Sequence, residues 1–340
     1  MKGPIVTDIE GLTLTQDDLR RIKDPLVGMV ILFSRNYESP RQLAALTREI
    51  HESAPGILIG VDQEGGRVQR FAEGFVKIPA MADYGDQFID DPEGAVASAA
   101  ASGFILAGQL RACGVDFTFA PCLDIEYGRC EVIGRRAFSL NARTVTRLAL
   151  AFIAGFRKAG MSNCAKHFPG HGFVSTDSHK ELPVDDRGPA RILMTDTAPY
   201  LWLGTQIDSV MMAHVLYPQF DSAPAGFSKK WIDFLRHKLH FEGTVFSDDL
   251  NMKGAGEKNI LGKAQSALSA GCDALILCNA PEDTDRLLKD LKWEKTPLFA
   301  DRSSILAPRG AFPDFETFSR SVHFLRALNQ VPGYGAPKNA

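Results

Sequence analysis

The sequence predicts an α/β fold, a single (β/α)8 barrel, and two observations carry that prediction. Short apolar or β-branched runs alternate with amphipathic helical stretches along the chain, a pattern typical of a parallel sheet covered on both faces. There are about eight such runs, which is the number of strands that closes a (β/α)8 barrel. A doubly wound open sheet is the structural alternative, although no GxGxxG motif follows an early strand to indicate its dinucleotide-binding form.

The expected elements follow one another in the order that such a fold requires. Strands are expected at residues 4–6, 27–33, 57–61, 116–121, 163–166, 209–213, 244–246 and 274–278. Helices are expected at residues 39–53, 93–112, 142–159, 189–203, 228–239, 261–270, 281–291 and near 316–328. Ser39 and Ser228 are candidate N-caps, and Gly160 and Gly271 are candidate helix stops. We expect one barrel domain over residues 1–340, with a frayed end at residues 331–340.

The composition narrows the class of protein. With 340 residues, 45% hydrophobic and 23% charged, the chain can bury a large core, which excludes disordered, collagen-like and disulfide-scaffold proteins. A net charge of -3 without a long basic run predicts no nucleic-acid partner and no anionic-membrane surface. No apolar run approaches the roughly 18 residues of a membrane helix, and the N-terminal region lacks a signal-peptide core. Six cysteines without a CxxC pair are expected to be free thiols in the cytoplasm.

Polar residues stand directly after most of the expected strands, at the end where barrel enzymes carry their reactive groups. They include Asp62 and Arg70, Asp124, the stretch at residues 166–172, His214, Asp248 with Asp249, and Asn279. Their convergence on one rim predicts a polar pocket. For single features other interpretations are open: Asp62 and Arg70 could form a structural ion pair, and Asp248–Asp249 could begin a solvated helix.

The segment at residues 166–179 carries Lys166, His167, His171, Asp177 and His179, and two chemistries fit it. In one, the histidines and Asp177 bind the metal of a metal-dependent hydrolase. In the other, Asp177 orients His179 as a general acid/base and a carboxylate on another strand is the nucleophile, as in glycoside hydrolysis with retention. Residues suited to hold sugar hydroxyls accompany the second interpretation: they are Asp62, Arg70, Lys166 and His167.

Four motifs together resemble the family 3 glycoside hydrolases, and within them the single-domain β-N-acetylglucosaminidases of bacterial peptidoglycan recycling. The motifs are GVDQEGGRVQR at residues 60–70, KHFPGHG at 166–172, DSH at 177–179 and FSDDL at 246–250. The resemblance covers most of the chain, from about residue 3 to residue 279. A sugar-binding barrel without activity would lack Asp248 or His179, and both are present.

The resemblance implies a role for each motif residue. Asp248 would be the catalytic nucleophile, and Asp177 with His179 the acid/base dyad. The residues Asp62, Arg70, Arg136, Lys166 and His167 would bind N-acetylglucosamine. The family usually has an acidic residue where Arg135 stands and a serine where Ala137 stands, so the match around Arg136 departs from the pattern. Many relatives take their acid from a second domain, for which this chain is expected to be too short.

The resemblance also implies the reaction and its partners. We expect release of terminal β-linked N-acetylglucosamine from N-acetylglucosaminyl-1,6-anhydro-muramoyl peptides, through a covalent glycosyl-enzyme on Asp248. Transfer of the sugar to phosphate instead of water stays open. We expect a cytoplasmic monomer that acts on a small-molecule sugar or muropeptide with no metal and no cofactor.

Overall fold

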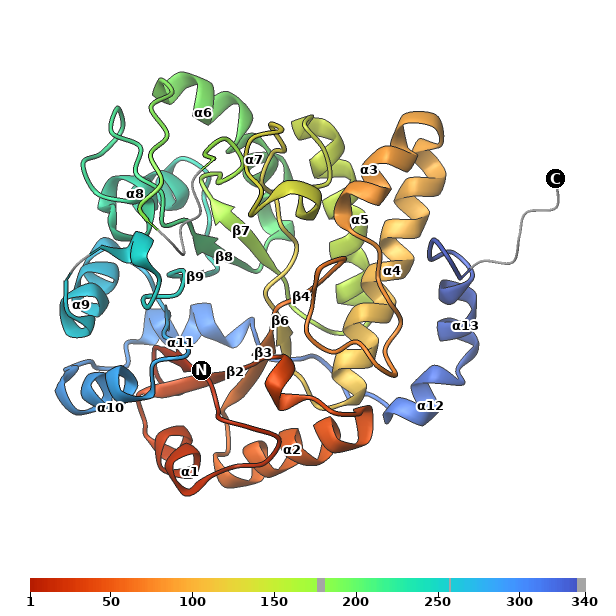
Figure 1. The fold of residues 1–340 in the computed structure, drawn as a ribbon, viewed down its shortest axis with the longest axis horizontal. Helices are drawn as coiled ribbons and strands as arrows, with labels where there is room; N and C mark the ends of the chain where they lie inside the picture. Colours follow the sequence, from red (N-terminus) through yellow and green to blue (C-terminus); the bar gives the residue numbers. More distant parts are fainter. Residues whose placement is uncertain (176–180, 257, 335–340) are drawn as a thin grey trace.

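The computed structural model describes residues 1–175, 181–256 and 258–334. Strands lie in the middle of the molecule and helices surround them (Figure 1). The fold is therefore of the α/β class, as predicted. Two parallel sheets form its centre: a five-stranded sheet in the order β10-β1-β2-β3-β6 and a three-stranded sheet in the order β7-β8-β9. Their strands are β1 (Ile5–Thr7), β2 (Val27–Leu32), β3 (Leu58–Val61), β6 (Phe117–Thr118), β7 (Cys164–Phe168), β8 (Ser209–Met212), β9 (Thr244–Phe246) and β10 (Leu275–Ile276).

The two sheets approach each other at both of their edges. A single parallel bridge joins Phe117 of β6 to Ser162 before β7, and another joins Phe246 of β9 to Ala274 before β10. Between the sheets, the rings of Phe117 and Phe246 stack with centroids 5.9 Å apart, and Phe119 packs on both of them. The inner faces of the two sheets thus share one aromatic core.

Helices cover the outer faces of the strands, and a second, larger apolar core lies between the two layers. The helices are α1 (Gln16–Lys23), α2 (Pro40–Ser53), α3 (Met81–Asp90), α4 (Pro92–Ala112), α5 (Ala142–Lys158), α6 (Pro189–Thr195), α7 (Ala198–Leu203), α8 (Lys229–His237), α9 (Ile260–Ala270), α10 (Pro281–Asp290), α11 (Pro297–Ser304), α12 (Phe315–Ser319) and α13 (Val322–Leu328). Among the described residues, no helix is both long and apolar enough to cross a membrane.

The cap and stop signals in the sequence coincide with helix ends. The side chains of Ser39 and Ser228 accept hydrogen bonds from the backbone amides of Gln42 and Trp231 at the starts of α2 and α8. Gly271 ends α9 in the left-handed region, with φ of 114°, a conformation that glycine adopts without steric cost. Such local signals therefore position the helices independently of the core.

The structure differs from the sequence-based expectation in several helices. The helix expected at residues 189–203 is two helices, α6 and α7, and the one expected near 316–328 is also two, α12 and α13. Helices α1, α3 and α11 were not expected. At the C-terminal end, Val331 is buried and the Tyr334 hydroxyl accepts a hydrogen bond from the Lys77 amide, so these two residues contact the rest of the chain.

Candidate active site

A cavity of about 340 Å³ lies at the C-terminal ends of the central strands. It brings together six residues that the sequence placed in a site, namely Asp62, Arg70, Arg136, Lys166, His167 and Asp248. Asp62 directly follows β3, Lys166 and His167 belong to the end of β7, and Asp248 comes two residues after β9. The expectation of a polar pocket at this rim is therefore met. Asp177 and His179 lie outside the described residues.

A small hairpin that the sequence did not predict forms one wall of the cavity. Strands β4 (Gln63–Gly65) and β5 (Val68–Gln69) pair antiparallel. Gly66 turns the chain between them with φ of 56°, and a Cβ on this residue would lie 2.8 Å from the Ala80 side chain. The turn therefore requires glycine both for its conformation and for its close approach to Ala80.

The buried side chain of Gln63 holds the end of this hairpin. Its Oε1 atom accepts hydrogen bonds from the backbone amides of Arg70, at 2.8 Å, and Phe71, at 3.2 Å. Its Nε2 atom donates to the Phe71 carbonyl at 3.0 Å. Gln63 thereby fixes the backbone from which the Arg70 side chain reaches the cavity.

Side chains of alternating charge lie next to one another along the cavity, in the order Arg70, Asp62, Lys166, Glu64 and Arg136. The Arg70 guanidinium lies 3.6 Å from an Asp62 carboxylate oxygen, and Lys166 Nζ lies 2.8 Å from the other one. Lys166 Nζ is also 2.6 Å from Glu64 Oε1. Glu64 in turn accepts two hydrogen bonds from Arg136, at 2.7 and 2.8 Å. Asp62 and Arg70 are thus an ion pair, but one that belongs to a larger charged group facing the cavity.

Glu64 is the most deeply buried carboxylate of this charged group, with 1% of its surface exposed. Burial alone would raise its pKa, but the positive charges of Arg136 and Lys166 outweigh that effect and hold the pKa of Glu64 well below its usual range. Burial likewise opposes the charged form of Lys166, yet Asp62 and Glu64 raise the pKa of Lys166 above its ordinary value. Both groups are therefore charged at neutral pH.

The two neighbouring acids after β9 differ in their surroundings. Burial disfavours the charged form of Asp248, but His167 and His214 outweigh it and lower the pKa of Asp248, and its Oδ1 accepts a hydrogen bond from the Asp249 amide at 2.8 Å. Burial instead raises the pKa of Asp249 to about 7. The residues that follow form a 3-10 turn, Lys253–Ala255, so Asp248 and Asp249 do not begin an α-helix.

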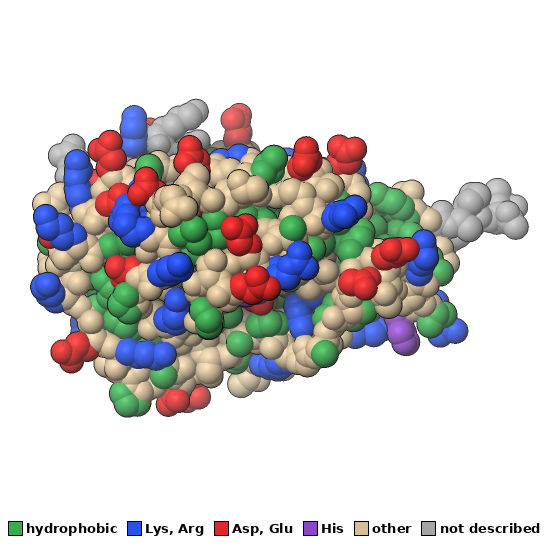
Figure 2. Space-filling view, turned by 90° about the horizontal axis from the view of Figure 1, so that it is seen from below, with side chains coloured by type: hydrophobic (Ala, Val, Ile, Leu, Met, Phe, Trp, Pro, Cys, Tyr) green, Lys and Arg blue, Asp and Glu red, His purple; other side chains and the backbone are tan. Residues whose placement is uncertain are grey.

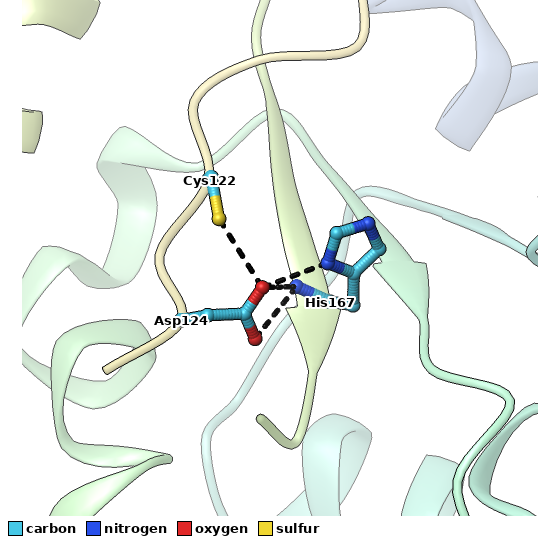
Figure 3. A group of neighbouring side chains, drawn as sticks. All are labelled: Cys122, Asp124 and His167. Atoms are coloured by element: carbon cyan, nitrogen blue, oxygen red, sulfur yellow. Dashed lines mark hydrogen bonds and ion pairs between the residues drawn. The ribbon is translucent and has the colours of Figure 1, made fainter. Parts of the chain in front are cut away.

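His167 is held by Asp124, a residue to which the sequence motifs assign no role. Its Nδ1 atom lies 2.7 Å from Asp124 Oδ2, and its amide nitrogen lies 3.3 Å from both carboxylate oxygens. Cys122 donates from Sγ to the same carboxylate at 3.2 Å (Figure 3). His171 also lines the cavity, and its amide donates to Asp124 Oδ1 at 2.6 Å.

The amino-acid sequence matches a known protein family and is similar to named proteins of that kind. Residues 6–298 match the family described as Glycosyl hydrolase family 3 N terminal domain. A "Beta-hexosaminidase" of Bordetella parapertussis is 50% identical over 337 residues, which span 97% of this chain and 96% of that protein.

Solved structures agree as well. The crystal structure of NagZ from Neisseria gonorrhoeae in complex with N-trifluoroacetyl-D-glucosamine has 40% sequence identity and a TM-score of 0.93, and the match covers 98% of both chains. The same NagZ in complex with zinc ion gives 39% identity and a TM-score of 0.92, again over 98% of both chains. The chain therefore belongs to glycosyl hydrolase family 3, among its β-hexosaminidases.

Proposed function

We propose that this protein hydrolyses terminal β-linked N-acetylglucosamine with retention of configuration, through a covalent glycosyl-enzyme on Asp248. The observation that carries the proposal is the Asp248 carboxylate, which has a lowered pKa and lines the same cavity as the charged side chains of Asp62, Lys166 and Arg136. An ionised carboxylate is the nucleophile that such a reaction needs. A glycosidase also needs fixed donors and acceptors for sugar hydroxyls, and these residues supply them.

The reaction has two steps. In the first, an Asp248 oxygen bonds to the anomeric carbon while the glycosidic C–O bond breaks, and the departing oxygen takes a proton from His179. In the second, water gives a proton back to His179 and attacks the anomeric carbon, which releases Asp248 and the free sugar. The assignment of His179, oriented by Asp177, rests on the family resemblance, because both residues lie outside the described part of the chain.

The sugar-binding residues are Asp62, Arg70, Arg136, Lys166 and His167. Support comes from their common position in one cavity and from the ion pairs that hold Asp62, Lys166 and Arg136 in place. N-trifluoroacetyl-D-glucosamine, the ligand of the solved Neisseria NagZ, supports an N-acylated glucosamine as the sugar. The full substrate that we propose is an N-acetylglucosaminyl-1,6-anhydro-muramoyl peptide.

The scaffold that we propose is one (β/α)8 barrel domain over residues 1–340. The bridges Phe117–Ser162 and Phe246–Ala274 support it, because each lies between an edge of one sheet and an edge of the other, where a closed barrel requires neighbouring strands. The shared core of Phe117, Phe119 and Phe246 supports it too, since barrel interiors are filled by side chains from different strands.

We further propose that the protein is a cytoplasmic monomer without a nucleic-acid or membrane partner. All six cysteines are free and buried, which suits a reducing compartment. Acidic and basic side chains are interspersed over the face drawn in Figure 2. A surface that binds a polyanion such as a nucleic acid would instead concentrate basic side chains.

The test is hydrolysis of a chromogenic N-acetyl-β-glucosaminide by the purified chain, with and without EDTA. We expect turnover that EDTA leaves unchanged, because a carboxylate nucleophile needs no Lewis acid. The metal-dependent hydrolase predicts the reverse: activity that EDTA abolishes and that zinc restores through His167, His171 and His179. No turnover of this substrate or of the muropeptide would reject the proposed function.

A further inference from the structure

Asp124 is buried, with 1% of its surface exposed. Each group that contacts its carboxylate in the described part of the chain can donate a hydrogen bond. Oδ1 accepts from the His171 amide at 2.6 Å. Oδ2 accepts from Cys122 Sγ at 3.2 Å and lies 2.7 Å from His167 Nδ1. The His167 amide is 3.3 Å from both oxygens.

This arrangement requires a carboxylate that only accepts. Burial would raise the pKa of Asp124, but His167 and His171 outweigh it and hold the pKa well below the usual range. Burial raises the pKa of the Cys122 thiol, so the sulfur keeps its hydrogen. Because the ionised Asp124 offers no hydrogen, the short contact to His167 needs a hydrogen on Nδ1.

Cys122, Asp124 and His167 are also close enough to be considered as metal ligands. Zinc with ligands at about 2.0 to 2.3 Å in a tetrahedron keeps their atoms roughly 3.3 Å or more apart. The Nδ1–Oδ2 distance of 2.7 Å is shorter than that, and both Asp124 oxygens already accept amide hydrogen bonds. The geometry fits a hydrogen-bonded group and not an ion site.

We propose that Asp124 is a positioning residue that keeps the hydrogen of the His167 ring on Nδ1, so that Nε2 faces the sugar as a hydrogen-bond acceptor. In Figure 3 the second ring nitrogen points away from Asp124, and His167 lines the cavity. Which nitrogen of a neutral imidazole carries the hydrogen is set by the bond that the other one makes. The proposal rests on the proposed function in one respect, that His167 contacts the substrate sugar.

The Asp124→Asn variant reverses this arrangement with almost no change of shape. The Asn side chain has one acceptor oxygen and one NH2 group in place of the two carboxylate oxygens. Its NH2 group must therefore face the donors of one of those two oxygens. The least costly orientation points NH2 at His167 Nδ1 and Cys122 Sγ, because the ring can move its hydrogen to Nε2 and the sulfur can accept. Nε2 would then donate into the cavity where it accepted before.

The first measurement determines the tautomer of His167 directly. Long-range ¹H–¹⁵N correlation spectra of the full chain, labelled in histidine, distinguish the two neutral tautomers and the imidazolium. The signals of His167 are assigned by their loss in His167→Gln. We expect the Nδ1–H tautomer at neutral pH in the wild type and the Nε2–H tautomer in Asp124→Asn.

Kinetics give the second measurement. We expect kcat/KM for the N-acetyl-β-glucosaminide to fall roughly tenfold to a hundredfold in Asp124→Asn, since a buried acceptor is lost and a donor is left unpaired. In a His167→Ala background the same change should cost less than about threefold, because coupled residues are not additive. Asp208→Asn is the matched control: Asp208 is a buried acid that pairs with Asn163 before β8 begins, and its loss should leave the tautomer and kcat/KM unchanged.

Each outcome decides the proposal. An Nε2–H tautomer or an imidazolium in the wild type overturns it. It is also overturned if Asp124→Asn lowers kcat/KM in the His167→Ala background by as much as it does with His167 present. If Asp124→Asn does not fold, the wild-type spectrum still decides. Wild-type protein that shows the Nδ1–H tautomer but hydrolyses no N-acetylglucosaminide would reject the proposed function and leave the positioning by Asp124 standing.

Discussion

At the scale of single residues, two adjacent carboxylates differ because their neighbours differ. Burial disfavours the charged form of Asp248, but the nearby His167 and His214 outweigh burial and lower the pKa of Asp248. Asp249 has hydrogen bonds from the amides of Asn251 and Cys278, but burial dominates and raises its pKa to about 7. Asp248 is therefore ionised at neutral pH, while a large part of Asp249 is protonated. This difference favours Asp248 as the nucleophile, because an anion is required.

Asp248→Asn should keep the fold and remove turnover. The two side chains are nearly isosteric, so packing changes little, whereas the amide cannot form the glycosyl ester. We expect the rate to fall by roughly 10⁴-fold or more, about 5 kcal/mol of barrier. Steady-state kinetics, with thermal unfolding to verify the fold, measure this. A variant that keeps about a tenth of the wild-type rate would move the nucleophile elsewhere, and Asp249 would be the next candidate.

His179→Ala should affect substrates in proportion to their need for a proton. A sugar alcohol leaves poorly without an acid, while a nitrophenolate leaves well, so disaccharide hydrolysis should fall roughly 10² to 10⁴-fold and glycosylation by the aryl glycoside far less. Added azide, which needs no base, should accelerate the variant, and Asp177→Ala should show a milder form of both effects. Equal slowing of both substrates without a response to azide would make His179 a binding residue.

At the scale of secondary-structure elements, the central strands could be predicted and the hairpin at the site could not. Strands such as β2 and β8 are short, mostly apolar runs that are buried on both faces. Such runs are typical of buried parallel strands, so they can be recognised in the sequence. Strands β4 and β5 contain Gln63, Glu64 and Gln69, whose pairing depends on buried amide hydrogen bonds instead of on an apolar pattern. The residue composition of a short segment does not indicate which buried hydrogen bonds its side chains will form.

The helices that were missed or joined have equally local causes. Helix α1 has two acidic residues in its first turn and three basic residues in its last turn, so it is amphipathic but largely charged. The single helix expected at residues 189–203 is divided between Asp196, the C-cap of α6, and Pro199 in the first turn of α7. Proline suits the first turn of a helix but interrupts a helix that would continue through it, and apolar periodicity alone does not register it.

Gln63→Ala tests whether the hairpin positions the site. Removing the side chain leaves the amides of Arg70 and Phe71 without their acceptor, which should lower the free energy of unfolding by about 1 to 3 kcal/mol. Since the backbone that carries Arg70 is released, we expect KM to rise more than kcat falls. Denaturant unfolding and steady-state kinetics measure the two effects.

Gln109→Ala is the control for that experiment. Gln109 is also buried, and its Oε1 accepts from the Val76 amide at 2.9 Å, but it does not line the cavity. We expect a similar loss of stability with KM unchanged. If both variants raise KM alike, the effect comes from general loosening of the fold and not from the hairpin.

At the scale of the whole molecule, the site joins parts of the chain that are far apart in sequence. Glu64 and Arg136 are 72 residues apart, and Asp124 and His167 are 43 apart. The sequence could place Asp62, Lys166 and Asp248 at one rim, because the strands that carry them were recognisable. It could not pair Glu64 or Asp124 with a partner, because nothing in a single sequence links residues across such a distance.

The buried ion pairs of Glu64 with Arg136 and Lys166 make the free energy of unfolding depend on pH. The pKa of Glu64 in the folded protein lies below the value of about 4.3 for an unfolded chain. The folded state therefore stays deprotonated where the unfolded state begins to bind protons. The stabilisation from Glu64 is complete above about pH 4.3 and is lost as the pH falls toward the folded-state pKa.

Glu64→Gln should therefore destabilise the protein most at neutral pH. Without the carboxylate, Arg136 and Lys166 keep buried charges that are only partly compensated, which costs about 3 kcal/mol or more. Below about pH 4.3 Glu64 binds a proton in the unfolded wild-type chain but not yet in the folded protein. The wild type therefore loses this stabilisation, and the difference between the two proteins should narrow as acid is added. Urea unfolding from pH 7 to about pH 3.5 measures it. Asp285→Asn, which removes a partly exposed ion pair with Arg20 and Arg21, should cost less than about 1 kcal/mol throughout. A constant gap between wild type and Glu64→Gln across this range would mean that Glu64 stabilises the fold by packing and not by charge.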